Sequence, residues 1–365
     1  MAGKRGINVQ FAIHETQDVW QRLQQTNTPI VLYGTGNGAD KILDAFAAYG
    51  IPVADIFVSD SFYRAQTFRG FQVLTFADVC RKYTDCLIIL AFAVFRPEML
   101  KRIREIQKHY KVLAPEMPVF GTGYYTWKTL EEQGGHMDHV WQMLADDSSR
   151  HVLENLINYR ISGKLIYLEQ ATSPRSEVFQ NILHLDGHEA YADLGAYRGD
   201  TIQEFLEQTG GSFRQIYALE PDEKNYQRLT DWVHTLPNEQ QKKISCYPLA
   251  SWCDRRVLPF DGGGGRNSSL QTGRRVAHTI DLDTLLGERP VTYVKMDVEG
   301  ADKETLLGMQ KTLARQQPKL AVSAYHRTED LLTLPDLIRQ GNPNYRIYLR
   351  HHPYIPAWET NYYCV

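Results

Sequence analysis

The chain has 365 residues, of which 43% are hydrophobic, so it is long enough for two globular domains with ordinary cores. Its formal net charge of -3, with both signs mixed along the chain, argues against nucleic acid as a partner. No stretch approaches the roughly 18 unbroken apolar residues of a membrane span, and the first residues lack an apolar signal segment, so we expect a cytoplasmic protein without a membrane partner. The five cysteines are odd in number and lack C-x-x-C spacing, which predicts neither a disulfide framework nor a thiolate metal site.

The first half alternates strand-like and helix-like segments, an order that predicts a parallel sheet covered by helices. Residues 30–33 read as a buried strand, a turn with Gly34, Gly36 and Gly38 follows, and the next residues have helical spacing. Further strands are expected at "VADIFVSD" (53–60), "CLIILAF" (86–92) and "MPVF" (117–120), with a helix at 97–109. We therefore predict a Rossmann-like α/β domain over residues 1–122.

The glycine turn of this domain leaves its ligand open. Asp60, after the second strand, lies where an acidic group meets a ribose hydroxyl in dinucleotide folds. The turn reads G-x-G-x-G, however, one residue short of the dinucleotide fingerprint, and its glycines could serve only to bend the chain. Two alternatives for the protein follow from it. One is an NAD-dependent oxidoreductase that uses this half, and the other is a nucleotide-sugar or partner-binding module with an inactive second half.

Residues 123–185 lose the strand pattern. Val152, Leu153 and Leu156 recur at helical spacing, and "DDSS" before them is a good helix N-cap. We predict a helical connector between two domains.

The stretch "YADLGAYRGDT" opens the second half with a buried strand, a glycine turn and a helix. Its spacing is D-x-G-x-x-x-G, from Asp193 through Gly195 to Gly199, and Asp200 and Thr201 are expected to cap the helix. A carboxylate in the turn would repel a pyrophosphate, so Asp193 favours a cationic or zwitterionic ligand.

Two further strand ends join this turn. Glu220 ends the next strand, at a position where an acidic side chain can accept both hydroxyl protons of a ribose. S-adenosylmethionine has a ribose, an amino-acid end and no phosphate, so it fits Asp193 and Glu220 together. A third strand, 291–296, leads into Asp297 and Glu299, and such strand ends form the binding crevice of a doubly wound sheet.

These motifs resemble the FkbM family of methyltransferases from about residue 190 to the last residue. The resemblance is carried by "DLGAYRGDT", "ALEPDEKNYQRL", "TIDLDTLL", "VKMDVEGADKETLLGMQ", "AVSAYHRTEDLLTLPDLI" and the closing "YRIYLRHHPYIPAWETNYYCV". It implies a class I methyltransferase fold over 186–365, with a seven-stranded Rossmann-like sheet whose last strand is antiparallel. The sixth and seventh strands would be "YRIYLRHH" and "ETNYYCV".

The resemblance also implies an activity and a set of contacts. The implied reaction transfers a methyl group from S-adenosylmethionine to a hydroxyl of a small-molecule acceptor, such as a sugar, a polyketide or a related metabolite. The glycine-rich insert at 261–273 is expected to be mobile and to face the substrate. The expected cofactor-binding residues are Asp193, Gly195, Ala196, Tyr197, Gly199, Thr201, Glu220, Pro221, Ala250, Ser251 and Asp297.

Methyl transfer to a hydroxyl needs a base near the acceptor oxygen. His326, which follows the strand "KLAVSAY", is the expected base, although a strand-end histidine often only satisfies a backbone carbonyl. Asp297 and Glu299 complete the expected catalytic set. These three residues could hold a divalent ion, but nothing in their spacing requires a metal. Lys295 is expected to form an ion pair.

Overall fold

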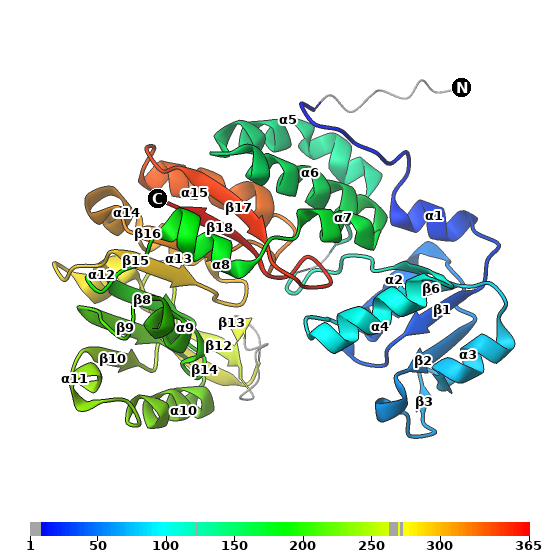
Figure 1. The fold of residues 1–365 in the computed structure, drawn as a ribbon, viewed down its shortest axis with the longest axis horizontal. Coiled ribbons are helices and arrows are strands. Elements are labelled where there is room, and N and C mark those ends of the chain that lie inside the picture. Colours follow the sequence, from blue (N-terminus) through cyan, green and yellow to red (C-terminus); the bar gives the residue numbers. More distant parts are fainter. Residues whose placement is uncertain (1–8, 122, 263–268, 271–272) are drawn as a thin grey trace.

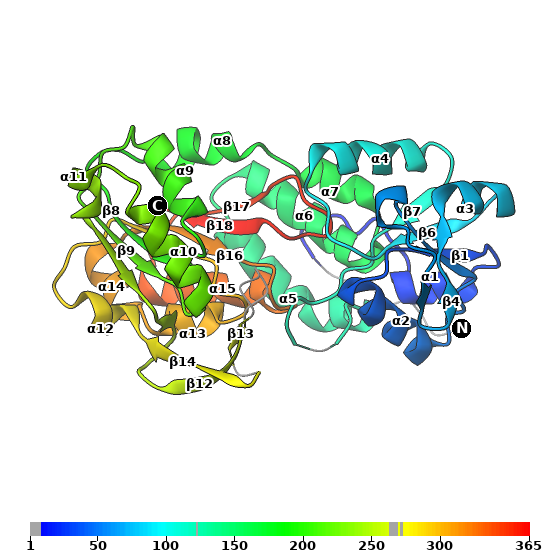
Figure 2. The same ribbon diagram turned by 90° about the horizontal axis from the view of Figure 1, so that it is seen from below.

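The computed structural model describes residues 9–121, 123–262, 269–270 and 273–365. Figures 1 and 2 show two α/β regions at opposite ends of the molecule, with a group of helices between them. No helix among the described residues is both long and apolar enough to cross a membrane. The mixed α/β fold with parallel sheets agrees with the fold predicted from the sequence.

The N-terminal region holds a five-stranded parallel sheet in the order β5-β2-β1-β6-β7. Buried aliphatic and aromatic side chains make its central strands, as expected of a sheet covered on both faces. Its strands are β1 (Ile30–Tyr33), β2 (Asp55–Val58), β5 (Leu74–Thr75), β6 (Leu87–Leu90) and β7 (Lys111–Leu113). Its helices are α1 (Val19–Gln25), α2 (Asn37–Tyr49), α3 (Phe76–Lys82) and α4 (Pro97–Gln107), and β3 (Thr67–Phe68) and β4 (Phe71–Gln72) form a small hairpin after η1 (Asp60–Phe62).

The last strand of this sheet differs from the sequence prediction. The structure places it at Lys111–Leu113, whereas residues 117–120 form no strand. Pro118 has no N–H for a ladder, which disfavours a central strand there. The segment instead reaches toward the second α/β region, where the N–H of Phe120 donates to the carbonyl of His326 at 3.0 Å.

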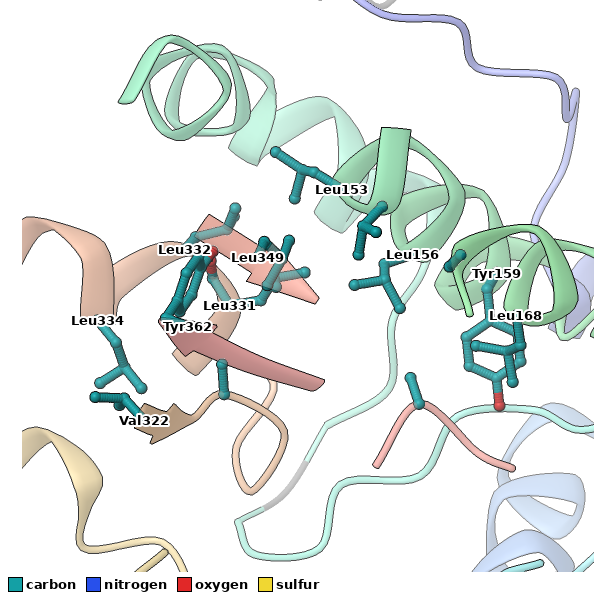
Figure 3. Close-up of a cluster of buried hydrophobic side chains, with 14 of the residues drawn as sticks. Leu153, Leu156, Tyr159, Leu168, Val322, Leu331, Leu332, Leu334, Leu349 and Tyr362 are labelled. Atoms are coloured by element: carbon teal, nitrogen blue, oxygen red, sulfur yellow. The ribbon is translucent and has the colours of Figure 1, made fainter. Parts of the chain in front are cut away.

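The middle of the chain is helical, as predicted. Its elements are α5 (Trp127–Met143), α6 (Asp147–Ser162), α7 (Leu165–Ala171), α8 (Arg175–Val178) and the short η2 (Phe179–Leu183). Asp146 caps α6 by accepting from the N–H of Ser149 at 2.7 Å. Figure 3 shows Leu153 and Leu156 of α6 facing Leu349 and Tyr362 across a shared core. The connector therefore contributes to the hydrophobic core of the second region, while the divisions at 122 and 185 stay predictions.

The second region holds a seven-stranded sheet in the order β10-β9-β8-β15-β16-β18-β17. Only β18 runs antiparallel to its neighbours, as the sequence predicted. The strands are β8 (Ala190–Leu194), β9 (Gln215–Leu219), β10 (Ile244–Tyr247), β15 (Tyr293–Met296), β16 (Lys319–Ser323), β17 (Ile347–His351) and β18 (Thr360–Cys364). The helices are α9 (Asp200–Gln208), α10 (Glu223–Val233), α11 (Asn238–Gln241), α12 (Leu282–Leu286), α13 (Asp302–Leu307), α14 (Gln310–Gln316) and α15 (Asp330–Gly341).

A four-stranded sheet extends from this region, at the lower edge of the view in Figure 2. Its strands are β11 (Ala250–Ser251), β12 (Val257–Asp261), β13 (Ser269–Leu270) and β14 (Arg275–Ile280). The glycine-rich insert falls within it, and most of the insert lies outside the described residues.

Candidate active site

The ends of three neighbouring strands, β9, β8 and β15, meet at one edge of the large sheet, and a cavity opens there. We call it the Glu220 cavity. Strand order reverses at β8, which is where doubly wound folds bind ligands. The sequence-predicted residues in its lining are Gly195, Tyr197, Thr201, Glu220, Pro221, Ala250, Ser251, Asp297 and Glu299. The structure thus brings most of the expected site together, while Asp193, Ala196, Gly199 and His326 lie outside this lining.

The turn after β8 needs glycine for a steric reason. Gly195 has a φ of 90°, and a Cβ there would lie 2.1 Å from the carbonyl oxygen of Asp297. Gly199 has a φ of 92°, and its Cβ would lie 2.4 Å from the ring of Trp232. Both conformations favour a residue without a side chain. The close approach at Gly195 brings the ends of β8 and β15 together at the base of the cavity.

The start of α9 differs from the expected capping. The N-cap is Gly199, whose conformation is left-handed, and no side chain caps the helix. Thr201 instead donates its hydroxyl to Asp193, which lies directly below the turn. The expected cap therefore serves to hold a buried carboxylate.

Glu220 presents a fixed carboxylate to the cavity. One oxygen accepts from the N–H of Tyr197 and the other from the N–H of Asp222, each at 2.9 Å. The residue is only 5% exposed, and its burial raises the pKa of Glu220 to about 7 despite these two hydrogen bonds. The remaining lone pairs of both oxygens can accept from a diol such as a ribose.

Asp193 takes a different place from the one expected. Its side chain is fully buried, lines neither cavity of this region and keeps one oxygen, Oδ1, without a hydrogen bond. Burial raises the pKa of Asp193, opposed by Lys295 on the neighbouring strand. The sequence suggested a direct contact between this carboxylate and a ligand, but the carboxylate does not face the cavity. Its partners in the structure are the hydroxyl of Thr201, which donates to it, and the nearby charge of Lys295.

A cluster of charged groups follows β15. Nε2 of His326 lies 3.2 Å from Oδ1 of Asp297 and 3.7 Å from Oε2 of Glu299, and its Nδ1 lies 2.7 Å from Oδ2 of Asp302. Tyr325 adds a hydrogen bond from its hydroxyl to Asp297 at 3.2 Å. The three residues expected to be catalytic are therefore adjacent.

The pKa values of the groups in this cluster are shifted in different directions. Burial opposes charge on His326, but Asp302 and Asp297 outweigh it and raise the pKa of the ring well above its ordinary value. Burial likewise opposes charge on Asp297, but Lys295 and His326 hold the pKa of that carboxyl well below its usual range. Burial, helped by the Asp297 and Asp302 carboxylates, raises the pKa of Glu299 to about 8, although His326 opposes the rise.

His326 is thus poorly placed for the expected role of base. Its side chain is 1% exposed and does not line the Glu220 cavity, whereas Glu299 does. The raised pKa keeps the ring protonated. Its Nδ1 donates to Asp302, whereas Nε2 makes no hydrogen bond and faces Asp297 and Glu299 as an ion-pair partner only. These features favour a positioning role for His326 and leave Glu299 facing the cavity.

The same cluster contains the groups that could bind a metal ion. Among the described residues, Asp302, His326 and Asp330 offer ligand atoms within 4.8 Å of one another, rather than the expected trio with Asp297 and Glu299. Nδ1 of His326 is already hydrogen-bonded to Oδ2 of Asp302 at 2.7 Å. Nε2 of His326 and Oδ1 of Asp302 are buried and have no hydrogen-bond partner among the described residues.

The adjacent histidines of the last motif have structural partners. Nδ1 of His351 lies 3.1 Å from the hydroxyl of Thr360, and Nε2 of His352 lies 2.8 Å from the hydroxyl of Tyr363. Both rings are buried.

One wall of the Glu220 cavity comes from parts of the chain that sequence reasoning did not connect. Val119 lines the cavity from the N-terminal side, and the Phe120 side chain packs where a Cβ on Gly300 would lie 2.9 Å from it. Lys41 of α2 holds this segment by donating to the carbonyls of Pro118 at 2.8 Å and Val119 at 3.0 Å. No spacing in the sequence marks Val119 as a site residue, because its neighbours lie far along the chain.

The loop between β17 and β18 completes that wall. Tyr354, Trp358 and Glu359 line the cavity, and the loop pairs through Ile355 with Val94 after β6. The two main-chain hydrogen bonds between Val94 and Ile355 measure 2.7 and 2.8 Å. Residues of the N-terminal region thus support two segments of the cavity wall.

The fold and this site define a class of protein. A parallel sheet with an antiparallel seventh strand inserted next to the fifth, and an acidic residue after the second strand, is the arrangement of the class I methyltransferases. Residues 193–354 match the model of the methyltransferase FkbM domain. This part of the chain is therefore similar to the methyltransferase domain of the FkbM family.

Solved structures extend the comparison. Methyltransferase FkbM from Methylobacillus flagellatus KT is similar with a TM-score of 0.74 at 22% identity, over 93% of this chain and 90% of that chain. This likeness shows a common fold across both halves. Aeropyrum pernix fibrillarin in complex with natively bound S-adenosyl-L-methionine (TM-score 0.35, 12% identity, 52% and 71% covered) and an rRNA methylase from Streptococcus thermophilus (0.34, 16%, 52% and 92%) are more distant. No curated protein matches the chain.

Proposed function

We propose that this protein uses S-adenosylmethionine to methylate a hydroxyl of a small-molecule acceptor, such as a sugar, a polyketide or a related metabolite. The observation that carries the proposal is the carboxylate of Glu220. It stands after β9 with both oxygens oriented by main-chain N–H groups and faces a cavity that the Gly195 turn shapes. The match to the FkbM domain supports the same reaction class.

The cavity lining suggests how the cofactor is held. Glu220 would accept from the two ribose hydroxyls, and the main chain at Gly195 would run beside the sulfonium. Leu249, Ala250 and Phe260 offer apolar surface for the adenine ring, and Ser251 keeps a buried hydroxyl without a hydrogen bond. An unsatisfied buried hydroxyl is costly, so a polar atom of the base is a suitable partner for it.

The charged cluster supports proton removal. S-adenosylmethionine supplies, when bound, a methyl group on a good leaving group, so the protein must align the acceptor oxygen and take its proton. We assign the proton to Glu299, which faces the cavity with a pKa of about 8, close to the operating pH that favours a general base. Asp297, which stays ionised, would orient the acceptor or the cofactor, and His326 would position both carboxylates.

The wall supported by the N-terminal region is the proposed acceptor side. Tyr354 and Trp358 offer aromatic rings with polar ends, and Glu359 offers a carboxylate, a combination suited to a hydroxylated molecule. The predicted N-terminal domain would then help to select the acceptor. NAD binding by that domain remains the rival proposal, and it is included in the test below.

Calorimetric titration with S-adenosylmethionine tests the proposal. We expect the wild type to bind it and Glu220→Ala to bind it about 10- to 100-fold more weakly, because hydrogen bonds to a charged group are lost. Glu223→Ala is the matched control, since Glu223 is exposed in the first turn of α10, and it should bind as the wild type does.

NAD serves as the control ligand in the same titrations. Binding of NAD alone, or no binding of S-adenosylmethionine by the wild type, would refute the proposed cofactor. Equal binding by Glu220→Ala and the wild type would remove Glu220 from the site.

A further inference from the structure

The side chain of Lys295 stands where two cavities meet. It lines the Glu220 cavity and a second one, here called the Arg175 cavity, which lies between the sheet and the helices α8 and α9. Asp200, Thr201, Asp297 and Glu359 also line both. Lys295 belongs to β15 and lies directly opposite Asp193 of β8 in the sheet register.

The ammonium of Lys295 has a weak set of protein partners. Its nearest ion pair is with Oδ2 of Asp297 at 3.7 Å, which is too long for a direct hydrogen bond, and no described residue accepts one from it. Burial opposes its charge, but Asp297 and Asp193 raise the pKa of Lys295 above its ordinary value. The group therefore stays charged, with donors to spare, where the two cavities meet.

The other cation of the Arg175 cavity is already engaged. Arg175 donates to both carboxylate oxygens of Glu204 at 2.6 and 2.8 Å and to Glu359 at 3.1 Å. These bonds tie α8, α9 and the β17–β18 loop together. Of these two cations, Lys295 is the one that can meet an anionic ligand group.

Lys295 and Glu220 belong to strands on opposite sides of β8. Glu220 follows β9 and Lys295 is in β15, and β8 lies between them, so their strands are about 10 Å apart. With a ribose on Glu220, the rest of the proposed cofactor would extend past Gly195 toward β15. Its amino-acid end carries a carboxylate and an ammonium on one carbon, and Lys295 and Asp297 offer the two opposite charges side by side.

We infer that Lys295 and Asp297 bind the zwitterionic amino-acid end of the cofactor, with Lys295 donating to the carboxylate and Asp297 accepting from the ammonium. This inference rests on the proposed use of S-adenosylmethionine and adds Lys295 to its binding residues. It gives a reason for a partly buried lysine to stand near two carboxylates, Asp193 and Asp297, without a hydrogen bond to either.

Two ligands and one substitution isolate the carboxylate contact. Decarboxylated S-adenosylmethionine keeps the ribose, sulfonium and ammonium and lacks only the carboxylate. By calorimetry we expect the wild type to bind it about 10- to 100-fold more weakly than S-adenosylmethionine, the value of a charge-assisted hydrogen bond. Lys295→Met should lose this preference and bind the two ligands within about twofold of each other, because neither would meet a cation.

Lys303→Met is the matched control. Lys303 is exposed on α13, so this variant should keep the full preference for the carboxylate. Lys295→Arg keeps a cation in place and should retain part of the preference.

Three results would overturn the inference. In the first, Lys295→Met prefers S-adenosylmethionine as strongly as the wild type does. In the second, Lys295→Met lowers the affinity for both ligands by the same factor. The third needs no variant and applies even if Lys295→Met fails to fold: equal binding of the two ligands by the wild type. A wild type that binds neither ligand refutes the proposed cofactor itself, a result distinct from these three.

Discussion

The two parallel sheets of this chain share one strand order but differ in the side chains around their switch points. In the first sheet the order is β5-β2-β1-β6-β7, and the first five strands of the second follow the same scheme as β10-β9-β8-β15-β16. In both, a glycine lies close to the carbonyl of a residue that follows a neighbouring strand. In the first sheet Gly38, after β1, approaches Ala91 after β6, and in the second Gly195, after β8, approaches Asp297 after β15. A Cβ on Gly38 would lie 2.3 Å from the oxygen of Ala91, and one on Gly195 would lie 2.1 Å from that of Asp297.

The surroundings of these two contacts are opposite in character. In the first sheet, Tyr33 stacks on Phe57 with ring centroids 4.3 Å apart and meets the edge of Phe92 at 4.8 Å. In the second, carboxylates occupy the corresponding edge, among them Glu220 and Asp297. A glycine turn therefore reports how closely the main chain approaches, and the flanking side chains decide whether the crevice suits a polar ligand.

Removing the proposed base should have the largest effect on the second crevice. We expect Glu299→Gln to lower the rate of methyl transfer about 10²- to 10⁴-fold, the usual contribution of a general base, and to leave the affinity for S-adenosylmethionine nearly unchanged. In the wild type, Glu299 must lose its proton, so the rate should rise with pH through about 8. Formation of S-adenosylhomocysteine with a hydroxylated acceptor, followed from pH 6 to 10, measures both effects.

Asp336→Asn is a control for that experiment, because Asp336 lies on α15 beside His136 and His139 and does not line either cavity. A Glu299→Gln enzyme with wild-type rate and pH profile would show that another group takes the proton.

Alanine at the two equivalent glycines compares the sheets directly. Gly195→Ala should lower the free energy of unfolding by about 1–3 kcal/mol because the new methyl group is overpacked. The left-handed backbone at this position should lower it by about a further 1–3 kcal/mol. It should also weaken cofactor binding at least about tenfold, because the same turn places the N–H of Tyr197 on Glu220. Gly38→Ala should lower the free energy of unfolding only by the cost of overpacking, and it should bind the cofactor as the wild type does. Urea unfolding and calorimetry measure the two quantities, and equal loss of affinity in both variants would contradict this division.

The pH dependence of cofactor affinity should be the smallest of these effects. Burial raises the pKa of Glu220 to about 7, so the carboxylate gains a proton as pH falls through that value and loses an acceptor for the ribose. The affinity for S-adenosylmethionine should therefore fall by up to about tenfold from pH 8 to pH 6. Glu220→Gln should flatten the dependence, and an equally steep profile in that variant would assign it to another group.

Local patterns in the sequence predicted the parts of the site that local geometry creates. Gly195 and Glu220 each sit at the end of a buried strand, and such ends meet at one sheet edge whatever the rest of the chain does. The acidic side chains were harder to assign. Asp193 belongs to the strand that Gly195 follows, yet its carboxylate is buried and accepts from the hydroxyl of Thr201 in α9.

The rest of the site depends on contacts between distant segments. Val119 and Trp358 enter the cavity wall because of where the N-terminal sheet is placed, and no periodicity or spacing encodes that placement. The strand expected at 117–120 failed for a related reason, since that segment pairs with His326 rather than with its own sheet. The place of His326 between three carboxylates likewise became visible only in three dimensions.

The pairing of Val94 with Ile355 has a consequence for how new specificities could be made. Both hydrogen bonds of that pair join main-chain atoms, and the bond from Phe120 to His326 is of the same kind. Substituting the side chains of these segments leaves such bonds in place, provided that proline is avoided at the donors. The N-terminal region thus acts as a fixed frame for this wall of the cavity. If the wall holds the acceptor as proposed, a library at Val119, Tyr354 and Trp358 would vary the acceptor without rebuilding the cofactor site.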